Sequence, residues 1–277
     1  TQASSSAASD VYKRQFKAMG GPARVVIDGI AESSYAGLDE LFAEVEQLVA
    51  ALEQRYSRYR EDSLVSLINR RAGSHQRTKI DEETIALLGL AEALWETTGG
   101  LFDITSGPLR RAWDFRSKGP ARPELIEAAR DLIGWEQLDW QGPYLRLPLK
   151  GMELDFGGIV KEYAVDGVAK RLRDAGVLSG MVDLAGDIAV IGDQADGYPW
   201  QISVRDPFKE GSICTVNLTD AAIATSGWGV WPVLFGPLLL NLLLRWVSGV
   251  RMSEVDLEER PGSVSYTHLT LPTTMLV

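Results

Sequence analysis

The sequence contains very little cysteine or histidine. Its 277 residues include one cysteine, Cys214, and two histidines, His75 and His268. These counts exclude a disulfide framework, a cysteine-built metal site and a histidine-rich metal centre. Because a single thiol is compatible with either a reducing or an oxidising compartment, cysteine usage leaves the localisation open.

Positive charge is also scarce, with 28 Lys and Arg against 38 Asp and Glu and a formal net charge of −10. This balance argues against a nucleic-acid partner or an anionic membrane surface. Neither G-x-G-x-x-G nor a Walker A motif occurs, which excludes the two commonest nucleotide-binding fingerprints. An anionic ligand would therefore depend on backbone amides and a metal ion.

Both ends of the chain differ in composition from its centre. Residues 1–15 are small and polar, contain no apolar signal-peptide core, and are predicted to be a disordered or artefactual extension. The run 228–246 is the most apolar in the chain, but two prolines, Asn241 and its limited length argue against a membrane span. We expect a domain at 16–227, followed by an apolar, non-native or frameshifted tail at 228–277.

The central region predicts separate helices and clustered strands. Apolar residues recur on one helical face from Ser34 onward, Asp81 is placed to cap a second helix, and a third is expected at 159–174. Two short strands are expected around the Gly-Gly-Pro turn at 20–22, and four alternating segments between 181 and 227 predict a β-meander. This mixture favours an α+β fold.

Three stretches combine glycine with an acidic residue at element boundaries: GGLFD (99–103), DFGGIVK (155–161) and AGDIAV (185–190). Glycines there let the backbone approach a ligand and supply amides for an anion, and a neighbouring acid can bind a hydroxyl or hydrated Mg²⁺. Taken singly, each is more typical of a turn with a capping Asp. Lys161 is unusual because it lies in the first turn of the helix expected at 159–174, whose positive end disfavours a cation, so we expect a negative partner, either Asp155 or a bound anion.

Taken together and in order, the motifs resemble the ApbE family, the FAD:protein FMN transferases. The resemblance extends from Phe16 to Gly227. Its blocks are MGGPARVVIDG, SRYREDSLVSLIN, TTGGLFDITSGPLRRAW, LDFGGIVKEYAVDGVA, VDLAGDIAVIG and AIATSG. The resemblance implies an ApbE-like, T-fold-like arrangement of mixed helices and antiparallel sheets.

The resemblance also implies a binding site for FAD as substrate and for Mg²⁺. Gly158 matches a position whose backbone carbonyl coordinates the magnesium ion. The positions that match cofactor-binding residues of the family are Met19, Tyr59, Leu101, Phe102, Asp103, Asp155 and Lys161. Asp166 is assigned to helix structure, and Ser226 and Gly227 match a loop that borders the pocket.

The implied reaction moves FMN from FAD onto a threonine hydroxyl of an acceptor protein and releases AMP. After Gly227 the family continues to a His-Ile-x-x-Pro motif and a late Asp and Thr/Ser that ligate the metal, and none is recognisable here; His268 is too distant and lies in the tail. Two alternatives therefore stay open, a Mg²⁺-dependent FAD pyrophosphatase and a non-catalytic FAD-binding protein. A membrane-anchored accessory subunit is a further class, but only the run 228–246 supports it.

Overall fold

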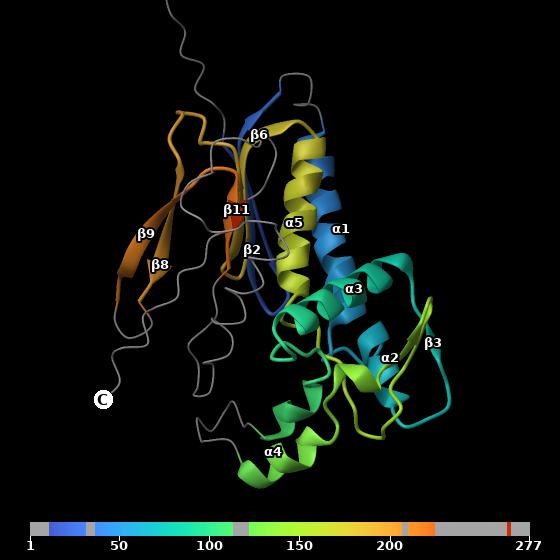
Figure 1. The fold of residues 1–277 in the computed structure, drawn as a ribbon. Helices are drawn as coiled ribbons and strands as arrows, with labels where there is room; N and C mark the ends of the chain where they lie inside the picture. The colour runs from blue at the N-terminus through green and yellow to red at the C-terminus, as the bar shows by residue number, and fades with distance from the viewer. Residues whose placement is uncertain (1–10, 32–36, 113–121, 207–209, 225–264, 267–277) are drawn as a thin grey trace, which may run out of the picture. The chain divides into compact units, whose positions relative to one another are not determined.

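Figure 1 shows the computed structural model, which describes residues 11–31, 37–112, 122–206, 210–224 and 265–266. The chain forms two compact units. Of the described residues, the first unit contains those up to Ala51 together with 161–224 and 265–266, and the second contains those between 52 and 160.

The first unit is built on a six-stranded sheet in the order β1-β2-β6-β7-β10-β11. Every pairing between neighbours is antiparallel except the short parallel pairing of β10 with β11. The strand bounds are Tyr12–Ala18 for β1, Gly21–Ile30 for β2, Val177–Leu184 for β6, Asp187–Ile191 for β7, Ala221–Ile223 for β10 and Ser265–Tyr266 for β11. A separate hairpin pairs β8 (Trp200–Arg205) with β9 (Ser212–Leu218).

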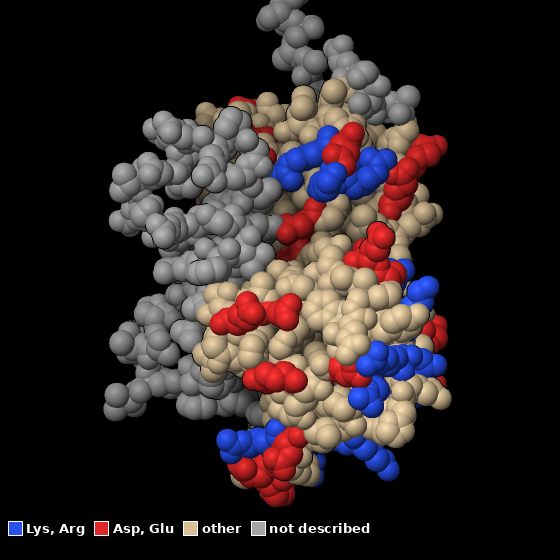
Figure 2. Space-filling view, turned by 45° about the vertical axis from the view of Figure 1, so that its right-hand side comes forward, with Lys and Arg blue, Asp and Glu red and all other residues tan. Residues whose placement is uncertain are grey.

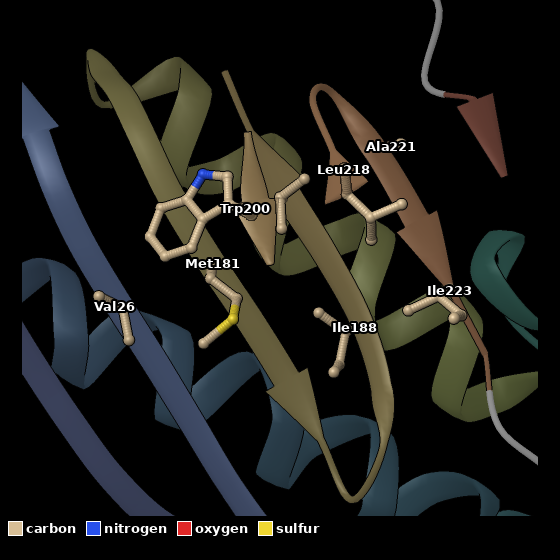
Figure 3. Close-up of a cluster of buried hydrophobic side chains, with 8 residues drawn as sticks. Val26, Met181, Ile188, Trp200, Leu218, Ala221 and Ile223 are labelled. Atoms are coloured by element: carbon tan, nitrogen blue, oxygen red, sulfur yellow. The ribbon is translucent and has the colours of Figure 1, made fainter. Parts of the chain in front are cut away.

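Both faces of this sheet are buried. On one face, side chains of β2, β6, β7 and β10 pack with Trp200 and Leu218 of the hairpin (Figure 3). The buried members of this cluster are Val26, Met181, Ile188, Val190, Trp200, Leu218, Ala221 and Ile223. Helices α1 (Leu38–Tyr56) and α5 (Val160–Asp174) lie on the other side of the sheet (Figures 1 and 3). The apolar face expected from the spacing after Ser34 therefore becomes the face that α1 turns inward.

The second unit is mainly helical. Its helices are α2 (Leu64–Arg70), α3 (Glu82–Thr97) and α4 (Pro123–Arg130), with 3₁₀ turns at Gly107–Ala112 and Trp135–Gln137. A small antiparallel sheet orders β3 (Thr78–Lys79), β5 (Tyr144–Arg146) and β4 (Asp139–Gln141). The starts of α2 and α3 follow local sequence chemistry, because Ser63 and Asp81 accept hydrogen bonds from the backbone N–H three residues later.

The α+β prediction is confirmed, with two differences in detail. Strand β1 begins at Tyr12, so the sheet includes residues that were expected to belong to the N-terminal extension. The four segments after residue 181 do not form one meander, because within the described ranges β8 and β9 pair only with each other while β10 returns to β7. Residues 1–10, Ser226, Gly227 and nearly all of the predicted tail lie outside the described residues.

No helix in the described ranges is long and apolar enough to cross a membrane. The apolar run 228–246 lies outside those ranges.

On the face seen in Figure 2, basic side chains lie beside acidic ones. The ion pairs Arg171–Glu44 and Lys170–Asp174 are two examples of such neighbours in the first unit.

Candidate functional site

The segment that carries Asp155 is held in place by two long-range backbone anchors in the second unit. The Asn69 side chain of α2 donates to the Leu154 carbonyl over 3.1 Å and accepts from the Leu154 N–H over 2.7 Å. The Asp155 N–H donates to the Ile104 carbonyl over 2.7 Å. An asparagine side chain thus pairs with the backbone as a neighbouring strand would, which fixes the direction in which Asp155 leaves the chain.

The Asp155 carboxylate is oriented by Arg58. Its Oδ2 forms an ion pair with Arg58, and its Oδ1 accepts a hydrogen bond from the Gly157 N–H over 2.9 Å. Arg58 also donates to the hydroxyl of Tyr59 over 2.9 Å, and its guanidinium lies 5.0 Å from the centre of the Tyr59 ring. Although Tyr59 is 78% exposed, these contacts limit the ring to one side of the loop.

Phe102 and Gly158 pack directly against each other. A Cβ atom added at Gly158 would lie 3.2 Å from Phe102 Cε2, so the close approach of the ring depends on glycine. Phe102 is buried, whereas its neighbour Leu101 is 58% exposed. Leu101 and Tyr59 therefore leave apolar surface uncovered in the second unit, a surface suited to a flat aromatic ring of a ligand.

Asp103 has a structural role in its loop. Its Oδ1 accepts from the Thr105 N–H over 2.7 Å and from the Thr105 hydroxyl over 2.6 Å, and its Oδ2 accepts from the Trp135 N–H over 3.0 Å. Oδ1 thus stabilises the loop itself, and Oδ2 connects the loop to the turn before β4. A contact between Asp103 and a cofactor would have to share oxygens that already hold the loop together.

Lys161 has its ion-pair partner in the first unit. Its Nζ lies 2.8 Å from Oδ2 of Asp187, which is buried at the start of β7. The negative partner in the structure is thus Asp187, and the expectation that Asp155 would be this partner is wrong, because Asp155 pairs with Arg58. The pair offsets the cost of placing a cation in the first turn of α5, and it leaves two ammonium protons of Lys161 for another acceptor.

Glu162 lies beside this pair with its Oε2 atom buried and without a hydrogen-bond partner in the described structure. Burial and the nearby Asp187 carboxylate raise the pKa of Glu162 to about 7. Near neutral pH this side chain therefore exchanges a proton under the electrostatic influence of the Asp187 and Lys161 charges.

Met19 lies in the turn between β1 and β2, with a φ of 50°. This left-handed conformation is rare for a residue other than glycine and costs about 1 kcal/mol. At the corresponding turn between β6 and β7, Ala185 has a φ of 55° and its Cβ lies 2.5 Å from where a Cβ on Gly21 would lie. The close approach of these two turns thus requires glycine at position 21.

The predicted magnesium position at Gly158 is not tested by the structure. Within the described ranges, no three His, Cys, Asp or Glu side chains are grouped in a way that could hold a metal ion. The Gly158 residue is exposed. Mg²⁺ dependence therefore rests on the family resemblance.

The structure brings Tyr59, Phe102, Asp155 and Gly158 together through Arg58, Ile104 and Asn69 in the second unit. Met19 and Lys161 belong to the first unit. Sequence reasoning missed three residues that orient predicted site residues: Arg58, Asn69 and Asp187. Arg58 and Asn69 lie within the SRYREDSLVSLIN block, and Asp187 lies in AGDIAV. The motifs therefore contained these three residues but did not indicate which site residue each of them contacts.

Comparison with known proteins identifies the family. The ApbE family matches residues 19–229. An FAD:protein FMN transferase of Vibrio cholerae is 32% identical over 208 residues, which covers 72% of this chain and 60% of the relative. One from Haemophilus influenzae is 26% identical over 195 residues, covering 66% of this chain and 56% of the relative. The chain thus spans about three fifths of the length of these curated relatives.

Solved structures agree with the fold. The flavin transferase ApbE from Vibrio cholerae has a TM-score of 0.68 at 28% identity and covers 80% of this chain and 73% of its own. The ApbE protein from Thermotoga maritima has a TM-score of 0.69 at 27% identity and covers 79% and 71%, respectively. The mixed helices and antiparallel sheets expected from the sequence are confirmed by these matches.

Proposed function

Because this chain belongs to the ApbE family, we propose that it acts on FAD and transfers FMN to a threonine hydroxyl of an acceptor protein, releasing AMP. The observation that carries the proposal is the clustering of Tyr59, Phe102, Asp155 and Gly158, four positions that the resemblance assigns to FAD and its metal ion. Long-range contacts hold these residues together, which is the organisation expected of a binding site rather than of separate turns.

The transfer balances without a redox step. The threonine Oγ forms a bond to the FMN phosphorus, the bond from that phosphorus to the bridging oxygen breaks, and AMP leaves with that oxygen. The hydroxyl proton is lost to solvent or to a nearby base. Positioning and charge stabilisation are the main contributions that a protein makes to such a step.

Side chains of this protein can supply both contributions. Asp155, fixed by Arg58, can accept hydrogen bonds from hydroxyl or ring N–H groups of the ligand. Lys161, held by Asp187, presents an ammonium that would stabilise negative charge on phosphate oxygens. The exposed Tyr59 ring and Leu101 side chain offer apolar surface to a flavin or adenine ring. In the family Mg²⁺ would neutralise pyrophosphate charge, and its ligation by Gly158 is part of the proposal.

The test is incubation of the full chain with FAD, Mg²⁺ and an acceptor domain that carries a target threonine. Transfer gives flavin fluorescence that stays with the acceptor after denaturation, together with one AMP per flavin. Free FMN and AMP without labelled acceptor would instead show an FAD pyrophosphatase, and intact FAD that copurifies would show a non-catalytic binding protein. Absence of any FAD binding would overturn the proposal.

Variants at the predicted site, compared with control variants elsewhere on the same helix, test whether the activity depends on the site. Asp155→Asn and Lys161→Gln are each expected to lower the rate at least 100-fold, because each removes a charge that faces the ligand. Lys170 and Asp174 form an exposed ion pair on the same helix as Lys161, so Lys170→Gln and Asp174→Asn serve as controls. A similar rate loss in the controls would mean that folding, and not the site, was affected.

A further inference from the structure

The second unit contains a cavity of about 630 Å³, and Tyr59 is the one predicted FAD contact among its described lining residues. This volume lies within the range of small-molecule sites. All of its lining residues lie between 58 and 153, and most are polar. Four arginines line it against two glutamates: Arg58, Arg70, Arg110 and Arg111 against Glu61 and Glu153. The cavity thus carries excess positive charge in a chain whose net charge is −10.

Glu153 holds two of these arginines in place. Its Oε2 accepts from Arg110 Nε over 2.8 Å, its Oε1 pairs with Arg111, and Arg111 also donates to the Gly151 carbonyl over 3.1 Å. Burial would raise the pKa of Glu153, but the hydrogen bonds from Arg110 and Arg111 outweigh it and lower the pKa. One shared carboxylate therefore fixes two guanidinium groups while neutralising only one of their charges.

Several guanidinium donors stay available. Arg110 uses only its Nε atom in hydrogen bonds to described residues, so both of its terminal nitrogens can bind a ligand. Arg70 donates to the Glu61 carbonyl over 2.5 Å and forms no ion pair within the described ranges. The positive charges that lack a carboxylate partner are thus those of Arg70 and of one member of the Arg110–Arg111 pair.

We propose that this cavity is a binding site for a phosphate dianion, either inorganic phosphate or the phosphate group of a small monoester, held by Arg70, Arg110 and Arg111. The planar guanidinium fork matches two phosphate oxygens at once, and a dianion matches the two uncompensated charges. The site adjoins the predicted FAD site, because Arg58 and Tyr59 also line the cavity, but Arg70, Arg110 and Arg111 are not among the predicted FAD contacts. The proposal rests on the cavity and its charges and does not depend on the proposed function.

Isothermal titration of the full chain at pH 8 without FAD tests the site, with inorganic phosphate and phenyl phosphate as probes and phenol as the neutral control. Arg110→Gln and Arg70→Gln are expected to raise the Kd at least tenfold. Glu61→Gln removes an exposed cavity carboxylate and is expected to lower the Kd at least twofold. Arg130→Gln removes an exposed arginine outside the cavity and is expected to leave the Kd unchanged.

The two probes distinguish the sources of the ligand. Tighter binding of phenyl phosphate than of phosphate identifies a monoester site, and equal binding identifies a phosphate site. Arg110→Lys keeps the charge without the fork and is expected to bind with an intermediate Kd. Because the Arg70 side chain is exposed, we expect the Arg70→Gln variant to fold, so it tests the site even if the Arg110 variants do not fold. Equal Kd values for the Arg70 and Arg130 variants, or displacement of the probe by FAD, would overturn the proposal.

Discussion

Replacing Glu162 with glutamine should make the protein more stable at pH 8 but not at pH 5. In the folded protein burial and the Asp187 carboxylate raise the pKa of Glu162 from its ordinary 4.5 to about 7. Between these values the folded state keeps a proton that the unfolded state has lost. The free energy of unfolding therefore falls as the pH rises through this window, and the loss is complete above pH 7.

The size of the effect follows from the shift. A shift from 4.5 to about 7 corresponds to about 3 kcal/mol at pH 8, as an upper value because part of the side chain reaches solvent. Glutamine keeps the shape of the side chain but never carries the charge. We therefore expect Glu162→Gln to raise the free energy of unfolding by about 2 to 3 kcal/mol at pH 8 and to change it by less than about 1 kcal/mol at pH 5.

Urea unfolding followed by tryptophan fluorescence measures this difference at both pH values. Because other titrating groups are common to both proteins, they cancel in the comparison of variant and wild type. Glu124→Gln, which changes an exposed glutamate at the start of α4, is the control and should have a small effect at both pH values. A stability difference for Glu162→Gln that is the same at pH 5 and pH 8 would refute the reasoning.

Three further predictions concern the same regions. Asp187→Asn should destabilise the protein by about 2 kcal/mol, since it leaves the Lys161 ammonium partly buried without its partner, and an unchanged urea midpoint would contradict this. Gly158→Ala should cost about 1 kcal/mol, because the new methyl group meets Phe102, and should weaken FAD binding as measured by flavin fluorescence. Asp103→Ala should lower thermal stability by about 2 to 3 kcal/mol through the loss of three hydrogen bonds; if only FAD affinity falls, Asp103 is a ligand residue instead.

Local elements could be predicted where the deciding interactions lie within a few residues. Ser63 and Asp81 cap their helices through bonds to residues three positions ahead, so the caps are visible in the sequence. The β-meander prediction failed in part because strand alternation identifies strands without identifying their partners. The sheet that β8 joins depends on where the Trp200 side chain packs. The position of Trp200 depends in turn on all the residues of the core cluster.

The candidate site shows the same division. The sequence by itself determined the family, the α+β fold and the motifs that carry Asp155, Gly158 and Lys161. Only the tertiary structure decided that Asp155 pairs with Arg58, 97 residues away, and that Lys161 pairs with Asp187. Such partners far apart in the chain depend on how helices and strands pack. Asp155 and Lys161 each pair with the opposite charge that packing brings within reach, because the interaction depends on distance in space and not on distance in sequence.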